Sequence, residues 1–362
     1  MKIPLLIVFY TSPLPPLITL RRLKELGFDI RLDHELTNVI KEAQLTGSKE
    51  PIRRLLENEI DRLDARIETA DYALTQIYSL VSTTLIIVPL MVFSISLFTA
   101  PRLILPSSIF FSAVSALLGV ASSTRLIPRE MREENPPPIY YAPLTLSLFS
   151  LLSWDLGILV ATLISAVFFY RFILLKQMRQ REGEGLFNRI MNYAFNPSFA
   201  LRESGVKLSD LASRRFPEFY RLIFSTVSLL MVFGGGIEDF KRLEEYVSRF
   251  QRLKRRLRIK VSTMLVFSLI SMGILGFGLG FILYFNKIFS NAGFMGSFLL
   301  YTVDPIEIKA SLTAFSLALS LVTASVMHGN PLYFPIYLAF FNVVGLLFFN
   351  ATPLLARSFL GV

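Results

Sequence analysis

The sequence contains no cysteine among its 362 residues. Disulfide bonds, thiolate zinc sites, iron–sulfur clusters and thiol nucleophiles are therefore excluded. It contains only two histidines, His34 and His328, which lie far apart and lack the spacing of a metal-ligand motif. Because a lone histidine is more often structural than functional, we expect no metal site and no cofactor.

Charged residues are also scarce. They make up 18% of the chain, whereas hydrophobic residues make up 53%. A soluble domain typically carries about 25% charged residues, so the composition instead predicts an all-α polytopic membrane protein. The formal charge of +10 would suggest a nucleic-acid partner in a soluble protein. In a membrane protein it more simply reflects orientation in the bilayer, and we expect no nucleic-acid partner.

The common catalytic motifs are missing. No GxxxxGK[ST] phosphate loop occurs, so ATP hydrolysis by that route is not expected. Gly276 and Gly280 form a GxxxG pair inside an apolar run, which is typical of close helix packing in lipid. The predicted spans are nearly free of charge, and we place the exception, Asp155, in an outer turn. We expect Asn342 and Asn350 to bond helix to helix and the protein not to be an enzyme.

Seven stretches have the roughly 20 apolar residues that cross a bilayer core. They are residues 77–100, 103–122, two helices within 140–175, and residues 261–285, 310–327 and 335–349. The run Leu222–Phe233 is too short, and we expect a buried helix of a polar segment. The run Ile3–Tyr10 resembles a signal-peptide core but has no small-residue cleavage site, so we expect it to be retained.

The distribution of charge orients these spans. With the N-terminus in the cytoplasm, nearly all Lys and Arg residues fall on cytoplasmic segments, as the positive-inside rule requires. The predicted organisation is a first helical module at 1–76, a transmembrane hairpin at 77–122, a cytoplasmic loop at 123–142, a second hairpin at 143–175, a second helical module at 176–260, and three transmembrane helices at 261–362.

The two helical modules share a pattern that predicts a duplication. Each contains a helix with an apolar seam that continues into a span. The first seam is Leu56, Ile60, Leu63, Ile67, Ala70, Leu74 and Ile77, and the second is Phe240, Leu243, Val247, Phe250, Leu253, Leu257 and Val261. Before each seam comes a glycine turn and an acidic helix start, and Gly47 can be aligned with Gly235. Earlier helices are expected at 17–26 and 36–45, and at 186–194, 208–216 and 219–233.

This pattern resembles the F-type inner-membrane platform protein of type II secretion, type IV pilus and archaellum systems, in its archaeal or Tad-like branch. The better copy of the motif comprises the turn Gly234-Gly235-Gly236, the acids Glu238 and Asp239, and the basic run that follows. The resemblance implies a multi-pass protein of a prokaryotic, in particular archaeal, cytoplasmic membrane. It also implies a homo-oligomer that couples a hexameric secretion ATPase to the assembly of pilin-like subunits into a filament.

The residues expected to contact the ATPase are the charged ones around the second turn. They are Glu238, Asp239, Lys241, Arg242, Arg252, Lys254, Arg255 and Arg256, beside the turn glycines Gly47, Gly234, Gly235 and Gly236. The basic run is also expected to contact anionic lipids. One alternative is a secondary transporter or channel, which needs polar groups near the bilayer midplane. Another is a membrane-embedded lipid-modifying enzyme, for which the best cluster, Arg129–Glu134, is interpreted as a solvated loop.

Overall fold

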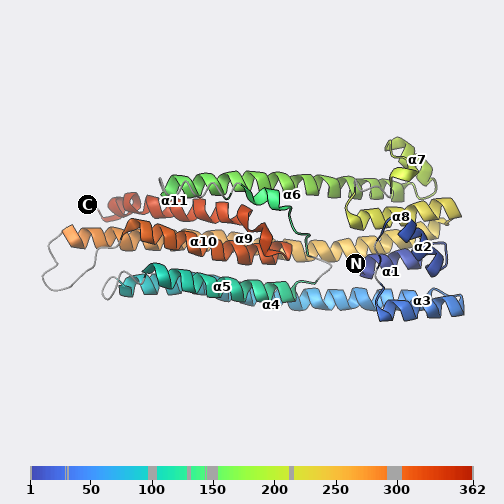
Figure 1. Cartoon of the computed structure of the whole chain (residues 1–362), viewed down its shortest axis with the longest axis horizontal. Helices are drawn as coiled ribbons and strands as arrows, with labels where there is room; N and C mark the ends of the chain where they lie inside the picture. Colours follow the sequence, from blue (N-terminus) through green and yellow to red (C-terminus); the bar gives the residue numbers. More distant parts are fainter. Residues whose placement is uncertain are drawn as a thin grey trace. The chain divides into compact units, whose positions relative to one another are not determined.

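The computed structural model describes residues 2–28, 30, 32–96, 104–128, 132–142, 144, 154–211, 216–291 and 304–360. Over these residues the chain forms helices joined by turns and contains no strand (Figure 1). The all-α fold class predicted from composition is therefore confirmed. The contacts divide the chain into two compact units. The polar unit comprises Met1–Arg66 and Ile173–Arg256, and the apolar unit comprises Ile67–Phe172 and Leu257–Val362.

Long apolar helices make up the apolar unit. It contains α5 (Ile104–Leu126), α10 (Pro305–His328), the short 3₁₀ helix η6 (Pro331–Tyr333) and α11 (Phe334–Leu360), and it shares α4 (Glu50–Ser96), α6 (Trp154–Asn192) and α9 (Ile237–Asn291) with the polar unit. Six helices among the described residues, α4, α5, α6, α9, α10 and α11, are long and apolar enough to cross a membrane. Ile87, Leu117 and Val167 on their surfaces are exposed, as lipid-facing side chains would be. The chain is a multi-pass membrane protein.

Six of the seven predicted spans correspond to these helices. The remaining one, the first helix of the 143–175 hairpin, falls mostly on residues 143 and 145–153, which lie outside the described residues. Within the apolar unit, α5 and α6 run in the same direction, as Figure 1 shows. The chain between Leu126 and Trp154 therefore connects opposite ends of this unit.

The polar unit also contains several short helices beside its parts of the three long ones. They are α1 (Lys2–Thr11), α2 (Pro16–Glu25), α3 (His34–Thr46), α7 (Pro197–Glu203), the 3₁₀ turn η4 (Leu208–Asp210) and α8 (Glu218–Phe233). Helices α2, α3 and α8 agree with predicted segments. The separate helix predicted at 186–194 is wrong, because α6 continues unbroken to Asn192. The helix predicted at 208–216 is reduced to η4 in its described part.

Helix α1 is a core element that the apolar pattern did not identify. Ile3 to Phe9 are all buried, and α1 packs against α2 and α8. At its start, the Lys2 ammonium lies 3.1 Å from the Glu59 carboxylate of α4 and 3.7 Å from that of Asp33. Together α1 and α2 have the composition of one broken span, but they meet at 119°. The run that resembles a signal-peptide core is therefore interior packing of the polar unit.

The long helices α4 and α9 are continuous, as predicted. They contain 47 and 55 residues, and Pro89 lies inside α4 without ending it. The first six predicted seam residues of α4 are buried, whereas Ile77 is half-buried and Tyr78 takes its place. The first four of α9, Phe240 to Phe250, are buried and Leu253 is half-buried. The side chains of the last two, Leu257 and Val261, lie outside the described residues.

Candidate functional site

Two left-handed glycines end the helices that precede α4 and α9. Gly47 follows α3 with φ of 66°, and Gly234 follows α8 with φ of 78°. Only glycine adopts this conformation at little cost, so both turns depend on it. Three residues after each glycine a long helix begins, at Glu50 and at Ile237.

The backbone conformations match in a register one residue away from the predicted alignment. Gly47 corresponds in backbone conformation to Gly234, not to Gly235, whose φ is not positive. The same offset brings three pairs of buried seam residues into correspondence: Leu56 with Leu243, Ile60 with Val247, and Leu63 with Phe250. Gly235 has a different role, because a Cβ there would collide with the side chain of Leu230.

Large apolar side chains are exposed around both turns. We define the turn surface as Leu45, Val232, Phe233 and Ile237. Leu45 is 88% exposed and Ile237 is 51% exposed. In an isolated soluble unit such side chains would normally be buried, and grouped exposure of this kind often indicates an interaction site. The sequence carried a signal for these residues, since they flank the glycines and lie outside the seams.

Lys49 connects the first turn to the end of α1. Its ammonium donates hydrogen bonds to the carbonyl oxygens of Ser12 and, at 3.4 Å, Tyr10, which terminate α1. Burial lowers the pKa of this ammonium; the charge of Asp239 opposes the shift and that of Arg242 reinforces it. Charges at the start of α9, on Asp239 and Arg242, therefore influence the pKa of Lys49, the residue that precedes α4.

The first turn of α9 places four of the predicted contact residues beside the turn surface. Glu238, Lys241 and Arg242 are exposed. The guanidinium of Arg242 lies 3.7 Å from the Glu238 carboxylate and 3.9 Å from that of Asp239. The Asp239 carboxylate also accepts a hydrogen bond from the backbone N–H of Gly236 at 3.1 Å. Two acids at the N-terminus of a 55-residue helix are also favoured by its dipole.

The basic run further along α9 is only partly available. Arg249 contacts Asp61 at 2.7 Å and Arg256 contacts Asp64 at 3.4 Å, both on α4. Lys254 is half-buried, whereas Arg252 and Arg255 are exposed. Arg256, one of the predicted contact residues, is exposed and also forms this ion pair within the polar unit.

Tyr246 of α9 contacts both α1 and α4. The Tyr246 ring meets that of Tyr10 edge to face at 5.6 Å, and its hydroxyl donates to the Glu57 carboxylate at 3.3 Å. Burial, with a contribution from the charge of Glu57, raises the pKa of Tyr246 to about 12. The phenol therefore remains protonated at neutral pH and can keep this hydrogen bond.

In the apolar unit, the GxxxG pair packs α9 against α11. A Cβ at Gly276 would collide with the backbone carbonyl of Gly345, and one at Gly280 would lie 2.7 Å from that of Phe349. Thr352 Oγ1 donates across the same contact to the carbonyl oxygen of Phe277 at 3.4 Å. Both glycines therefore allow a backbone approach that any side chain would prevent.

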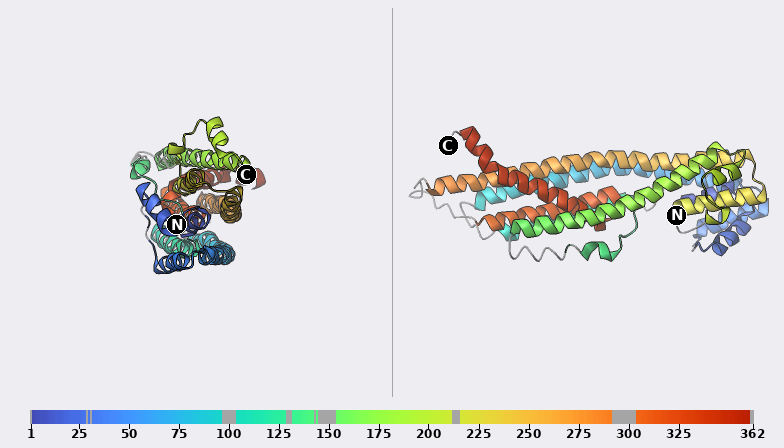
Figure 2. Two further views of the ribbon diagram at one scale, coloured as in Figure 1. Left: turned by 90° about the vertical axis from the view of Figure 1, so that its right-hand side faces the viewer. Right: turned by 90° about the horizontal axis from the view of Figure 1, so that it is seen from above.

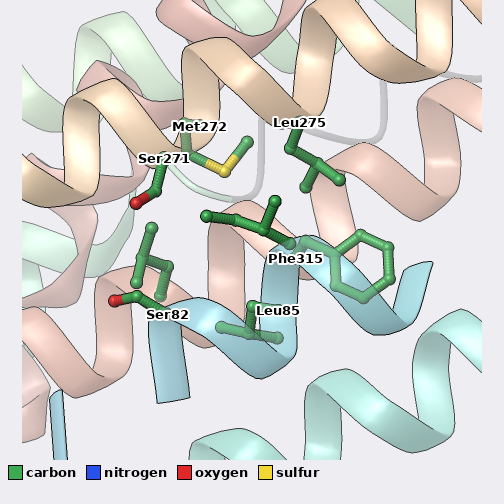
Figure 3. Close-up of a pocket in the computed structure, with 8 residues that line it drawn as sticks. Ser82, Leu85, Ser271, Met272, Leu275 and Phe315 are labelled. Atoms are coloured by element: carbon green, nitrogen blue, oxygen red, sulfur yellow. The ribbon is translucent and has the colours of Figure 1, made fainter. Parts of the chain in front are cut away.

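A small cavity lies among α4, α9 and α10 (Figure 3). It is lined by Ser82, Leu85, Ile86, Ser271, Met272, Leu275, Phe315 and Leu319. The walls are apolar apart from two serine hydroxyls, and that of Ser82 makes no hydrogen bond. This lining offers no charged group to an ion or a polar substrate.

Among the described residues, the helix-to-helix bond expected from Asn342 is not found. The amide of Asn342 is buried on α11 without a hydrogen-bond partner, and Asn350 is exposed. Several buried hydroxyls of this unit instead bond to carbonyls of their own helix, such as Ser108 to Ile104 at 2.7 Å. Helix α6 begins at Trp154, so the backbone of Asp155 lies in its first turn, while its side chain lies outside the described residues.

The structure also brings together titratable groups that the sequence reading kept apart. His328 at the end of α10 lies against Glu133, which belongs to the segment interpreted as a solvated loop. That interpretation is wrong for Glu133, whose side chain is only 16% exposed, while residues 129–131 lie outside the described residues. No sequence spacing could have shown this contact, because 195 residues separate its neighbours Asn135 and Asn330.

Within the described part of the chain, no three His, Asp or Glu side chains are placed to hold a metal ion. The fold thus defines a class, an all-α multi-pass membrane protein with a helical polar unit. No protein-family model, curated protein or solved structure matches this chain.

Proposed function

We propose that this protein is a membrane platform that couples a cytoplasmic hexameric ATPase to the assembly of a type IV pilus-like filament, archaellum or type II secretion pseudopilus. One observation carries the proposal. Helices α4 and α9 each begin beside a left-handed glycine turn in the polar unit and continue without a break into apolar segments. The chain is not an enzyme in this proposal and needs no cofactor.

Continuous helices suit this work because an α-helix resists compression and bending over a few turns. A force applied at Glu50 or Ile237 would pass along one hydrogen-bonded backbone toward the membrane. The turn surface and the charged first turn of α9 supply the contact for the ATPase. The glycine contact of Gly276 on α9 with Gly345 on α11 has no interlocking side chains. In this proposal, α9 can therefore shift by about 1–2 Å along α11, as helices do in other switching proteins.

The proposed orientation places the polar unit in the cytoplasm of a prokaryote, where an ATPase has access to it. The excess of Lys and Arg in the polar segments supports this side. Arg252 and Arg255, which are exposed on α9, are available to anionic lipid headgroups or to the ATPase. Pilin-like subunits would approach the apolar unit from the bilayer, and a second copy of the chain would complete the platform.

Two alternatives are less well supported. A transporter or channel needs polar groups that face a path, whereas many buried hydroxyls of the apolar unit bond to their own helices. A lipid-modifying enzyme needs a free acid or base at a membrane face. His328 and Glu133 are the nearest match, but the two side chains are largely buried, with 12% and 16% exposed, and His328 Nε2 is hydrogen-bonded to the Tyr337 hydroxyl.

The deciding experiment reverses charge beside the turn surface. Lys241→Glu with Arg242→Glu should abolish filament assembly, seen by electron microscopy of cells, while the amount of protein in the membrane fraction stays unchanged. Arg179→Glu with Arg181→Glu is the matched control, because both residues are exposed in the polar unit on α6. Normal filaments from the first variant, or equal loss from the control, would reject the proposed contact surface.

A further inference from the structure

Three aromatic side chains gather on the surface of the polar unit where α6 ends and α7 begins. The Tyr193 ring lies 6.1 Å from the Phe195 ring and 5.2 Å from the Phe199 ring, measured between centroids. Phe195 is 72% exposed and Phe199 is 50% exposed. We define the aromatic patch as these three residues. Figure 1 and the left view of Figure 2 both show α7, in yellow-green, on the side of α6 that faces away from α8.

Hydrogen bonds fix the backbone beneath the aromatic patch. The Asn196 N–H donates to the Tyr193 carbonyl at 2.8 Å, and the Phe199 N–H donates to the Asn196 carbonyl at 3.0 Å. Met191 before this turn and Ala200 after it are buried, so both ends of the turn are anchored. The aromatic patch is therefore held in place without a partner, and a partner that binds it has little ordering cost to overcome.

Arginine side chains flank the aromatic patch. Arg189 precedes Tyr193 by one helical turn, Arg202 follows Phe199 by three residues, and both are exposed. Within the described part of the chain neither guanidinium forms an ion pair. The polar unit as a whole also contains more Lys and Arg than Asp and Glu residues. A partner that complements this surface therefore carries acidic residues around an apolar centre.

The position of the aromatic patch along α6 favours a protein partner over the membrane surface. Helix α6 is apolar to about Leu175 and continues unbroken to Asn192, which lies about 25 Å further along the helix axis at 1.5 Å per residue. The polar headgroup region on one side of a bilayer is only about 5–8 Å thick. Aromatic rings and arginines are also the residue types that are enriched at protein–protein interfaces.

We propose that the aromatic patch is a docking site for an acidic segment of a partner protein. An apolar side chain of this segment packs against Phe195 and Phe199. Carboxylates beside it pair with the guanidinium groups of Arg189 and Arg202. The site shares no residue with the turn surface and does not depend on the platform role.

Selection of peptides on the full-length protein in nanodiscs tests this proposal. The probe is a phage-displayed library of short random peptides, depleted beforehand on nanodiscs without the protein. Peptides that combine an aromatic or aliphatic residue with several Asp or Glu residues should be enriched. A synthetic copy of the enriched peptide should bind roughly tenfold more weakly to Phe195→Ser with Phe199→Ser, and to Arg189→Glu with Arg202→Glu. All four substituted side chains are exposed, so both variants should fold.

Leu17→Ser with Ile18→Ser is the matched control, because both side chains are exposed on α2 of the same unit. This variant should bind the peptide as tightly as the wild type. Enrichment of basic or uncharged peptides, enrichment of none, or full affinity in the Phe195→Ser with Phe199→Ser variant would overturn the docking site.

Two further measurements on the same nanodiscs examine other occupants of the aromatic patch. Flotation with phosphatidylglycerol vesicles that is lost in Phe195→Ser with Phe199→Ser would assign the patch to lipid. Self-association that is lost in this variant, measured by analytical ultracentrifugation, would assign it to a second copy of the chain. Either result would reject the acidic partner, and we expect neither.

Discussion

Single glycines in this chain act for two different physical reasons. Gly47 and Gly234 are needed for a backbone conformation, since both have positive φ and open space around the missing Cβ. Gly276 is needed for volume, because its helical backbone touches another helix. A Gly→Ala substitution should therefore destabilise the protein at both kinds of site. At Gly234 the cause would be backbone strain, and at Gly276 it would be a steric clash.

Gly276→Ala should lower the stability of the apolar unit. The added methyl would push α9 and α11 apart, and overpacking of this kind typically costs about 1–3 kcal/mol. Gly185→Ala is the control, because this helical glycine has nothing within 4 Å of its Cβ position and should gain about 0.5–1 kcal/mol. Thermal unfolding in detergent should show opposite shifts in Tm, and equal shifts would contradict the assigned contact.

Gly234→Ala tests the conformational role. An alanine at this positive φ costs about 1–2 kcal/mol, so the melting temperature should fall. Gly236→Ala is the matched control two residues away, where φ is not positive and the nearest atom to the new Cβ is 3.9 Å distant. If Gly236→Ala were as destabilising as Gly234→Ala, the proposed equivalence of Gly47 and Gly234 would lose its basis.

At the scale of elements, the opposite charges of the two long helices complement one another. The acids Asp61 and Asp64 of α4 face the basic residues Arg249 and Arg256 of α9. Part of the charge that suggested an external partner is therefore used within the polar unit.

A charge swap measures this pairing. Arg249→Asp and Asp61→Arg should each destabilise the polar unit, and the double variant should recover most of the loss. Because both side chains are partly exposed, the coupling should be small, on the order of 0.5 kcal/mol at low salt. Chemical denaturation of the four proteins gives the coupling energy. Additive losses in the double variant would mean that the two residues do not interact.

Because of Tyr246, the stability of the folded protein should depend on pH in the alkaline range. Its folded pKa of about 12 lies above the ordinary tyrosine value of about 10, so the unfolded chain loses this proton first. Stability should fall as pH rises from about 10 toward 12. Tyr246→Phe should reduce this fall, whereas Tyr72→Phe, at an exposed position, should not. Unfolding curves across this range would show whether the two variants differ.

The elements could be predicted from sequence only where local pattern determines them. The seams and the continuity of α4 and α9 follow from periodicity, and six spans follow from apolar length. Composition could not distinguish α1 from a signal-peptide core, because α1 is buried by tertiary contacts with α8, and these cannot be inferred from the sequence of α1. The alignment of Gly47 with Gly235 missed the match in backbone conformation, because the sequence does not show which glycine of Gly234-Gly235-Gly236 adopts positive φ. The contact of His328 with Glu133 depends on long-range packing that no local pattern contains.

For the whole molecule, the directions of the helices constrain the topology. Helices α5 and α6 run the same way within the apolar unit, so the chain between them has to return. A return across the bilayer would give seven crossings, with the polar unit and the 132–142 segment on one side and the start of α10 on the other. Without such a return, six crossings could not keep both parts of the polar unit on the same side.

The absence of native cysteine makes this topology directly measurable, because each introduced thiol is the only one in the chain. Ser48→Cys, Ile139→Cys and Ile306→Cys place thiols at exposed positions in the polar unit, after α5 and at the start of α10. In intact cells a membrane-impermeant maleimide should label only Ile306→Cys, and in inverted vesicles only the other two. The cysteine-free parent reports background. Labelling of Ile139→Cys and Ile306→Cys from the same side would exclude the seven-crossing arrangement and, with it, the cytoplasmic platform.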